Sequence, residues 1–326
     1  MYFFVFLILI NLLIFYKFFT ISRKIGFFDK PDLKRKLHKT PIANIGGVIF
    51  FVSILLFIFY CVFNDKENFN FLFKLAPYFI IFIIIGLADD KINLNPNLKL
   101  LLFSMVIFFL ILNNEIFLIK DLKFIILEKE ISLSYLSYLF TIIAFLAFIN
   151  SMNMFDGINL QSSFYIAFLC FVFISKNFFS ELFIIILIPL FFFSLLNYKS
   201  RCFLGNNGTY SLSFLFSCIF IFSYNEGVIF YPEEILLIMI LPGIEMIRLT
   251  IMRLIKGRHP FKGDKNHLHH YLLRKYGNSK AVIISTILST TPYLSLTIFK
   301  DYILYVIIFS IFAYFYIIKT LEKNFK

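Results

Sequence analysis

Long apolar segments dominate this chain and constrain its fold more than any other feature. A segment of roughly 17–25 apolar residues can cross a hydrocarbon layer about 30 Å thick as a helix, because a helix satisfies its own backbone hydrogen bonds. With 60% hydrophobic and only 15% charged residues, the composition excludes a soluble domain of this length. Eleven such segments lie near residues 1–20, 44–64, 71–88, 97–113, 133–150, 162–176, 180–197, 209–224, 232–252, 280–297 and 301–319.

The basic residues predict the orientation of these helices. With the N-terminus outside, the inside segments hold 23 Lys and Arg and the outside segments hold 7, while Arg248 falls within a predicted helix. We therefore predict an all-α integral membrane protein, a polytopic bundle of about 10–11 transmembrane helices with its polar loops on the cytoplasmic face. No internal repeat or linker divides the chain, so we expect one membrane domain over residues 1–326. The net charge of +12 is then a topology signal and a surface for anionic lipid or phosphorylated substrate, and it gives no reason to invoke nucleic acid.

Two features are expected to be structural only. The four cysteines show no CxxC or Cys/His spacing, so we assign them to packing. Residues 114–132 alternate roughly between apolar and other side chains around a charged middle, which predicts a short hairpin on the membrane surface.

The first two inside loops carry clustered charges. In GFFDKPDLKRKLHKTPIANIGG, Lys36 and His38 belong to a basic cluster that fits either a positive-inside anchor or a landing site for a lipid phosphate. In GLADDKINLNPNLKL, Asp89 and Asp90 end an apolar segment, with Lys99 following. Acids near lipid are costly to place and are functional by default, and one of two neighbouring acids can act as a base while the other stays ionised. A solvated acid pair that ends a helix is the alternative.

Asparagines mark the third and fourth inside loops. In FINSMNMFDGINLQSS, polar residues recur every three positions at Asn150, Asn153, Asp156 and Asn159. This spacing puts them along one side of a helical end, with Gly157 providing a turn, and such a row can bind a metal, a diphosphate or a nucleobase edge. In LGNNGTYS, Asn206 can offer an amide oxygen to a cation or amide hydrogens to phosphate, beside glycines that let a ligand approach the backbone. A Gly-Asn turn before a helix is the alternative there.

The fifth inside loop, RLIKGRHPFKGDKNHLHHYLLRKYG, is the most specific segment of the chain. It holds four of the five histidines, one acid and several cations, among them Arg258, His259, Asp264, Lys265, His267, His269 and His270. A structural zinc site is an alternative. No acid or Cys completes a tight zinc pattern, however, and the surrounding cations suit a polyphosphate better.

Taken in order, the segments ADD, NSMNMFDG, FLGNNGT and HPFKGDKNHLHH resemble the signature segments of the polyprenyl-phosphate N-acetylhexosamine-1-phosphate transferase family. The resemblance covers the whole chain in helix number, topology and loop order. The HLHH ending is similar to the undecaprenyl-phosphate GlcNAc-1-phosphate transferase branch. The phospho-MurNAc-pentapeptide translocase branch typically has a PFHHH version, and its reaction is the alternative within the family.

The resemblance implies transfer of a sugar 1-phosphate from a UDP-N-acetylhexosamine to undecaprenyl phosphate at the inner membrane, with release of UMP and with Mg²⁺ or Mn²⁺ as cofactor. It implies catalytic roles for Asp89, Asp90, Asp156, His267, His269 and His270. It implies substrate contacts for Lys36, His38, Lys99, Asn150, Asn153, Arg258, His259, Asp264 and Lys265, and metal contacts for Asn153 and Asn206. Membrane lipids are implied as partners, nucleic acid is not, and a homodimer is left open.

Asn206 departs from the family, which usually has a metal-binding Asp at that position. An Asn carbonyl can coordinate Mg²⁺ but brings no negative charge, and phosphoryl transfer depends on that ion to neutralise the diphosphate. We expect activity, because the other polar positions are intact. An impaired member that binds lipid or nucleotide sugar is the alternative.

A transporter or lipid-binding protein is the rival from another class. Such a protein needs polar or broken segments near the middle of the membrane. The centres of the predicted helices are mostly Phe, Ile and Leu, while the acids and histidines lie at one face. The sequence therefore favours the enzyme.

Overall fold

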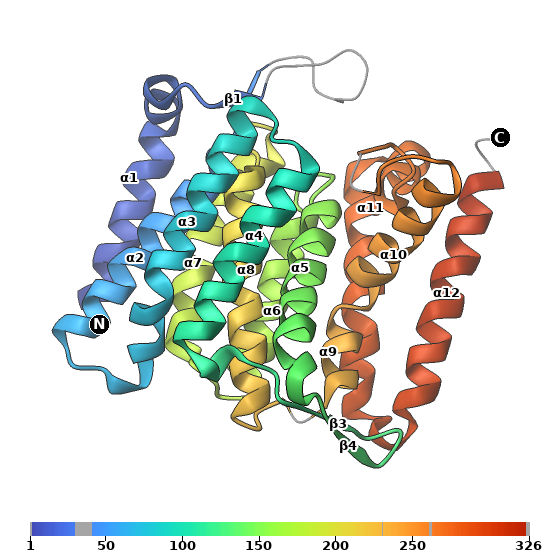
Figure 1. Cartoon of the computed structure of the whole chain (residues 1–326). Coiled ribbons are helices and arrows are strands. Elements are labelled where there is room, and N and C mark those ends of the chain that lie inside the picture. Colours follow the sequence, from blue (N-terminus) through green and yellow to red (C-terminus); the bar gives the residue numbers. More distant parts are fainter. Residues whose placement is uncertain (1, 30–40, 230, 261–262, 324–326) are drawn as a thin grey trace. The chain divides into compact units, whose positions relative to one another are not determined.

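The computed structural model describes residues 2–29, 41–229, 231–260 and 263–323 (Figure 1). The chain divides into two units. Unit 1 comprises Met1–Glu115 and Leu169–Cys218, and unit 2 comprises Ile116–Phe168 and Ile219–Lys326. Each unit therefore combines two separate stretches of the chain. The expectation of one domain over the whole chain stays a prediction.

Unit 1 is a set of apolar helices with one short strand pair. Its complete helices are α1 (Tyr2–Ile25), α2 (Gly46–Phe63), α3 (Asn70–Ile92), α4 (Pro96–Asn113) and α7 (Ser180–Tyr198), joined by the second part of α6 (Gln161–Ser175) and the first part of α8 (Gly205–Asn225). Strands β1 (Phe28–Asp29) and β2 (Ile42–Ala43) pair antiparallel. The backbone N–H groups of Gly46 and Gly47 donate to Phe203 O and Leu204 O, both at 3.0 Å. These bonds hold the start of α2 against the start of α8.

Unit 2 carries the hairpin and the later helices. It contains β3 (Asp121–Phe124), β4 (Lys129–Ser132), α5 (Ser137–Phe155), α9 (Pro232–Ile238), α10 (Ile240–Ile255), α11 (Leu268–Leu294) and α12 (Ile303–Lys323), with the first part of α6 and the last part of α8. Strands β3 and β4 pair antiparallel with Asp121 opposite Ser132, so the hairpin predicted within residues 114–132 is confirmed.

A helix covers each of the eleven predicted apolar segments, so the all-α membrane fold class is confirmed. Within the described ranges, seven helices are long and apolar enough to cross a membrane, or eight if the bent pair α9 and α10 forms one span. Helix α6 has 15 residues and is shorter than this standard. The total of 10–11 spans and their sidedness stay predictions.

The expectation of one continuous helix over residues 232–252 is wrong. Helices α9 and α10 meet at Met239 with a bend of 79°. Pro242 has no N–H, so it cannot donate to the carbonyl of Ile238 four residues earlier. The hydroxyl of Tyr165 donates to that carbonyl instead, at 2.8 Å. A transporter needs polar or broken segments near the middle of the membrane, and this helix is broken. The argument against a transporter therefore does not hold for residues 232–252.

Helix α11 also changes direction, at Gly277. This residue has φ of 76° and ψ of 171°, a conformation that glycine adopts without strain. Residues 268–276 before the kink contain two of the loop histidines, and residues 278–294 after it match the predicted apolar segment. The kink therefore separates the part of α11 that carries polar chemistry from the part that suits the membrane.

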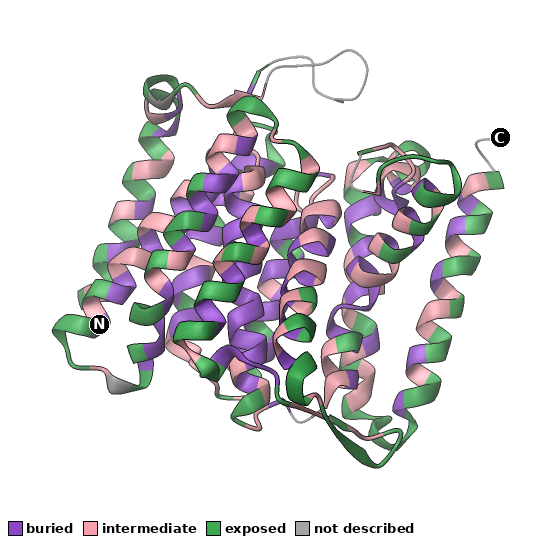
Figure 2. Cartoon of the chain, viewed as in Figure 1, coloured by how far each residue is buried: buried purple, intermediate pink, exposed green. Residues whose placement is uncertain are grey.

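Burial separates the two sides of α12 (Figure 2). Phe309 and Phe312 are 74% and 72% exposed, whereas Tyr314 and Ile318 are 2% and 4% exposed. Exposed phenylalanines on a helix of this length suit contact with lipid tails. The four cysteines are all buried and unpaired, as their assignment to packing requires.

Candidate functional site

The acid pair lies in the last turns of α3, and its two carboxylates have different partners. Asp89 is 2% exposed. Its Oδ1 accepts a hydrogen bond from the Leu94 backbone N–H at 2.8 Å, and its Oδ2 accepts from Lys99 Nζ at 3.1 Å and Tyr210 OH at 2.8 Å. These three donors fix the orientation of the carboxylate. We call Asp89, Asp90, Lys99 and Tyr210 the acid cluster.

The connection between α3 and α4 brings Lys99 back to Asp89. Helix α3 ends at Ile92, and its C-cap Asn93 adopts a left-handed φ of 50°. Asn95 then caps α4 by accepting a hydrogen bond from the Asn97 N–H at 2.9 Å, and Pro96 fills the first helical position, where no N–H is needed. The tight turn places Lys99 on the first turn of α4, where it forms the ion pair with Asp89.

Asp90 caps the N-terminus of α8. Its Oδ1 accepts from the Asn206 N–H at 3.0 Å, and its Oδ2 accepts from the Asn207 N–H at 3.1 Å and from Asn207 Nδ2 at 2.7 Å. Gly205 begins the helix with a φ of 74°, and a Cβ there would lie 2.9 Å from Asp90 Oδ2. The segment LGNNGTYS is thus the first turns of α8, whose positive end binds this protein's own carboxylate.

The acid cluster offers oxygen atoms to a cation but forms no closed cage. Among the residues that the structure describes, no three His, Cys, Asp or Glu side chains gather as a metal site. The Asn207 Oδ1 is buried and has no hydrogen-bond partner among the described residues. It packs on Gly47, where an added Cβ would lie 2.2 Å from it, so no ion fits between them. Asp90 and Asn206 are only half-buried. They fit Mg²⁺ that is held by one or two protein oxygens together with substrate phosphates and water.

The polar row of the third loop is only partly helical. Asn150 and Asn153 lie on the last turns of α5, and Asp156 is its C-cap, with φ of −77° and ψ of 69°. Asn159 lies beyond the helix, so the predicted row along one helical side is wrong at that residue. Asp156 Oδ1 accepts a hydrogen bond from Ser162 Oγ at 2.6 Å, which fixes the carboxylate against the start of α6.

Arg253 organises the loop that carries the histidines. Its Nη1 donates to Pro260 O at 2.7 Å, and its Nε donates to Asp264 Oδ2 at 2.8 Å. The other oxygen of Asp264 accepts from the Asn266 N–H at 2.8 Å, which closes a tight turn. Burial opposes ionisation of Asp264, but these hydrogen bonds outweigh it and hold its pKa below the ordinary value. Asp264 therefore shapes the loop, with Arg253 as its ion-pair partner.

His267 is held as a neutral ring. It is 6% exposed, and burial lowers its pKa to about 3. Arg253 Nη2 lies 3.4 Å from Nε2. Because a guanidinium has donors only, Nε2 accepts and the ring proton is assigned to Nδ1.

His269 and His270 continue the cluster on the first turn of α11. The rings of His267 and His269 stack with centroids 4.9 Å apart, and those of His269 and His270 lie edge to face at 4.4 Å. Burial lowers the pKa of His269 well below its ordinary value, and burial with the charges of Arg274 and Lys265 lowers that of His270 to about 4. All three rings are therefore neutral near pH 7, and His270 is the least buried of them. We call residues 263–270 the histidine segment.

The remaining predicted residues are distributed as follows. Arg258 and His259 are exposed, and Lys265 is half-buried. Lys36 and His38 lie outside the described residues. Unit 1 brings together Asp89, Asp90, Lys99 and Asn206, and unit 2 brings the Asp156–Gly157 turn against His269.

Sequence reasoning missed Tyr210 and Arg253 as members of these clusters. Tyr210 belongs to the quoted LGNNGTYS segment, five residues after its first glycine, and only helical geometry turns its hydroxyl to Asp89. Arg253 had been counted as one of many cations of an inside loop. Its position one residue from a predicted helix end was the only available signal.

A family model matches the middle of the chain. The model described as Glycosyl transferase family 4 matches residues 72–224. This range contains the whole acid cluster and the Asn153–Asp156 turn, and it ends before the histidine segment.

Relatives extend the similarity over most of the chain. A Thermotoga maritima protein named undecaprenyl-phosphate alpha-N-acetylglucosaminyl 1-phosphate transferase is 26% identical over 275 residues, which cover 81% of this chain and 78% of the relative. Proteins of the same name from Escherichia coli K12 and Pasteurella multocida are 23% and 28% identical. Their alignments cover 93% and 78% of this chain, and 86% and 73% of the relatives. The resemblance inferred from the loops is thereby confirmed.

Proposed function

We propose that this chain, which matches the model of glycosyl transferase family 4 over residues 72–224, transfers a sugar 1-phosphate from a UDP-N-acetylhexosamine to undecaprenyl phosphate. The reaction releases UMP and leaves a diphosphate-linked lipid sugar that starts a cell-envelope polysaccharide. We place the reaction at the cytoplasmic face of the inner membrane, since the basic loops predict that side for the polar clusters.

The observation that carries this proposal is the acid cluster. Two adjacent carboxylates end an apolar helix, inside the range that matches the family, and each is held by positioned donors. Two buried or half-buried acids are costly to place at the membrane surface, and acids in such positions are functional by default. A site for phosphoryl transfer needs such fixed oxygens, because positioning and charge neutralisation supply most of its catalysis.

In the proposed step, an oxygen of the lipid phosphate attacks the β-phosphorus of the UDP-sugar. A new P–O bond forms to the lipid phosphate, and the bond from the β-phosphorus to the bridging oxygen breaks, so UMP departs with that oxygen. We assign substrate contact to Asp90, because it is only half-buried and its carboxylate can therefore take a proton from the lipid phosphate. Asp89 is buried and orients Lys99 and Tyr210.

Magnesium belongs to this proposal as a shared ligand. Asp90 and the side-chain carbonyl of Asn206 would hold it with the substrate diphosphate, and Asn153 stays a candidate ligand on its sequence alone. When bound, the ion would neutralise the negative charge that the diphosphate carries. Mn²⁺ suits the same oxygen ligands.

The histidine segment is proposed to hold the diphosphate and the sugar. Since the imidazoles are neutral near pH 7, His270 serves as a hydrogen-bond donor and acceptor and not as a cation. The positive charge comes from Lys265 and Arg258, which are half-buried and exposed. Asp264 and His267 act on this site through the loop conformation that they share with Arg253.

The nucleotide contacts are proposed for the end of α5. Asn150, Asn153 and Asp156 lie there, and the amide of Asn150 donates to Leu146 O at 2.7 Å, which orients its carbonyl away from its own helix. Asp156 is fixed by Ser162. Lys36 and His38 remain proposed for the lipid phosphate on their sequence alone.

Transfer of radiolabelled sugar phosphate to undecaprenyl phosphate tests the function. Detergent-purified protein would be given a panel of UDP-sugars, with Mg²⁺ or EDTA, and the labelled lipid would be measured. We expect metal-dependent labelling that Asp90→Asn and Asp89→Asn abolish, while the exposed control Tyr316→Phe keeps it. Labelling that persists in both Asp variants would refute the assignment to the acid cluster.

One observation favours a second candidate, a family member that binds substrate without transferring it. Asn206 gives the metal no charge where the family usually has an acid. The same assay separates the two candidates, because the second one predicts no labelling by the natural chain and labelling after Asn206→Asp.

A further inference from the structure

A buried polar network outside the acid cluster and the histidine segment links three helices of unit 2. Glu245 and Arg248 on α10 meet Tyr314 on α12, and these side chains are 3%, 8% and 2% exposed. Sequence reasoning had placed Arg248 in an apolar helix and had assigned nothing to the other two. We call these three residues the Glu245 network.

Glu245 caps the start of α11. Its Oε1 accepts from the Leu268 N–H at 2.8 Å and from Arg248 Nη2 at 3.0 Å, while its Oε2 accepts from the hydroxyl of Tyr314. Leu268 is the first residue of α11, so its N–H has no partner within the helix. A carboxylate at this end of a helix is favourable, because the helix dipole is positive there.

Arg248 binds Asn266, the residue before His267, whereas Glu245 binds Leu268, the residue after it. Its Nη2 donates to Asn266 O at 2.6 Å, and its Nε donates to the oxygen of Tyr314. The network therefore holds the backbone directly before and directly after His267. The Nδ1 of His267 lies 3.9 Å from Glu245 Oε1, and it has no hydrogen-bond partner among the described residues.

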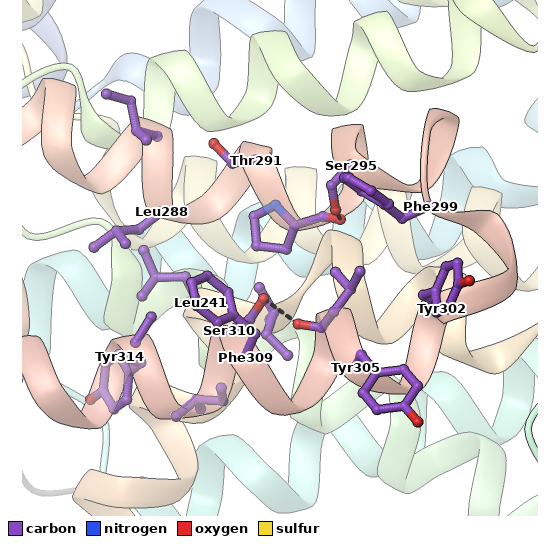
Figure 3. A pocket seen from close by; sticks show the side chains of 16 residues that line it. Leu241, Leu288, Thr291, Ser295, Phe299, Tyr302, Tyr305, Phe309, Ser310 and Tyr314 are labelled. Atoms are coloured by element: carbon purple, nitrogen blue, oxygen red, sulfur yellow. Dashed lines mark hydrogen bonds between the residues drawn. The ribbon is translucent and has the colours of Figure 1, made fainter.

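Tyr314 has its ring in one environment and its hydroxyl in another. The ring lines an apolar cavity of about 470 Å³ between α10, α11 and α12 (Figure 3). Serine hydroxyls at the wall bond to nearby backbone carbonyls, as Ser310 does to Val306 O within α12 at 2.7 Å and Ser295, the C-cap of α11, does to Pro292 O at 2.8 Å. The cavity is thus apolar in character, whereas the Tyr314 hydroxyl bonds to Glu245 and Arg248 outside it.

Stability alone does not account for these polar side chains. Replacing a buried ion pair by apolar residues of similar volume is often neutral or stabilising, because desolvation of two charges offsets their attraction. The charged network provides directed hydrogen bonds to two backbone atoms, which an apolar cluster would not provide. Those atoms flank His267, at the start of the run His267–His270.

We propose that Glu245, Arg248 and Tyr314 are positioning residues that fix the orientation of the histidine segment for the transfer step. The proposal rests on the proposed function. It makes the last helix, α12, part of the reaction machinery through the hydroxyl of Tyr314 and through Glu322, whose Oε1 lies 3.7 Å from Arg248 Nη1, although α12 carries none of the motif residues.

Tyr314→Phe is the sharpest test, because it removes the hydroxyl and keeps the ring that lines the cavity. Tyr316→Phe is the matched control, since Tyr316 lies on the same helix and is 74% exposed. We expect Tyr314→Phe to lower kcat by roughly 10-fold or more, with KM for the UDP-sugar changed by less than about 3-fold, because small misplacement of a reacting group is costly. An unchanged kcat, or an equal loss in the control, would overturn the proposal.

A double replacement separates positioning from folding. Glu245→Leu with Arg248→Met removes both charges and keeps similar volume, so the unfolding temperature should stay near that of the natural chain while kcat falls. If the double variant keeps its unfolding temperature and also keeps kcat, the proposal is wrong. Should that variant fail to fold, Tyr314→Phe decides alone.

Hydrogen exchange gives a readout that does not need activity. In the free protein, amides of residues 264–272 should exchange at least about 10-fold faster in Tyr314→Phe than in Tyr316→Phe. If the natural chain shows no transfer with any donor, the proposed function fails while faster exchange still supports the network. Equal exchange in the two variants would mean that the network does not hold the segment.

Discussion

The imidazole of His269 lies directly on the backbone of Gly157. A Cβ placed on Gly157 would be 1.9 Å from His269 Nε2 and 2.3 Å from Cε1, distances that no real contact allows. The turn after α5 and the first turn of α11 are thus packed against each other within unit 2. The φ of Gly157 is not in the left-handed region, so its backbone conformation does not require glycine. The close approach of the His269 ring does.

Substitution Gly157→Ala should therefore displace the histidine segment. We expect a loss of about 1–3 kcal/mol in the free energy of unfolding, typical of an overpacked site, and a fall in transfer activity of roughly 10-fold or more. The matched control is Gly243→Ala, because no described residue lies within 4 Å of a Cβ at that position. A thiol-reactive dye can follow unfolding, since all four cysteines are buried. Equal behaviour of the two variants would contradict the packing.

The sequence was sufficient to predict the helices but not their breaks. Apolar length alone located all eleven helical segments, and alternation with turn chemistry located the hairpin at β3 and β4. The bend at Met239 was missed, because Pro242 occurs in a segment whose hydropathy is continuous. Whether a proline breaks or only kinks a helix depends on what satisfies the freed carbonyl, here Tyr165 from α6.

The candidate site was predicted by residue type more than by arrangement. Asp89 and Asp90 stood out because acids are rare in such a chain, yet their separate partners, Lys99 with Tyr210 and the N-terminus of α8, follow from packing between distant segments. Arg253 resembled an ordinary topology signal, and Arg248 was only a charge within a predicted helix. Their burial and their bonds to loop backbone distinguish them, and neither property is visible in a single sequence.

Loss of the Asp90 charge should weaken the start of α8. In Asp90→Asn, the amide keeps one acceptor and turns an NH₂ group toward the N–H donors of the helix. We expect a cost of about 1–2 kcal/mol in the free energy of unfolding, in line with helix caps and charge-assisted hydrogen bonds.

The dye assay at increasing temperature checks this effect without substrate. Asn97→Ala is a suitable control, because that side chain is exposed on α4. If Asp90→Asn loses activity but keeps its unfolding temperature, the capping role is wrong and the carboxylate serves the reaction alone.

Acid should destabilise the histidine segment. The pKa of His270 falls from its ordinary 6.5 to about 4 and that of His267 to about 3, both mainly through burial. Between pH 6.5 and 4 the unfolded chain therefore binds protons that the folded chain does not, so stability is complete above pH 6.5 and is lost as the pH falls. Each such imidazole contributes about 1.4 kcal/mol per pH unit within this window.

Unfolding temperatures measured from pH 7.5 to pH 4.5 test this dependence. His270→Gln should flatten the profile relative to the natural chain, because one titrating group is removed. His259→Gln is the control, since that histidine is exposed on the same loop. A profile that His259→Gln flattens and His270→Gln leaves unchanged would contradict the burial of His270.

Restoring an acid at position 206 should strengthen metal binding at the acid cluster. Asn206→Asp adds an anionic oxygen next to Asp90, whose Oδ1 already accepts the N–H of residue 206. We expect the Mg²⁺ concentration for half-maximal transfer to fall several-fold, because Mg²⁺ prefers carboxylate oxygen. We also expect the unfolding temperature in EDTA to drop, because the two carboxylates repel each other.

Asn207→Asp is the contrasting variant, since Asn207 is fully buried and its Nδ2 donates to Asp90 and to Asn44 O at 3.0 Å. That change should destabilise the protein with or without metal. An unchanged Mg²⁺ requirement in Asn206→Asp would mean that position 206 is not part of the metal site. Its remaining role would then be that of its backbone N–H, which donates to Asp90.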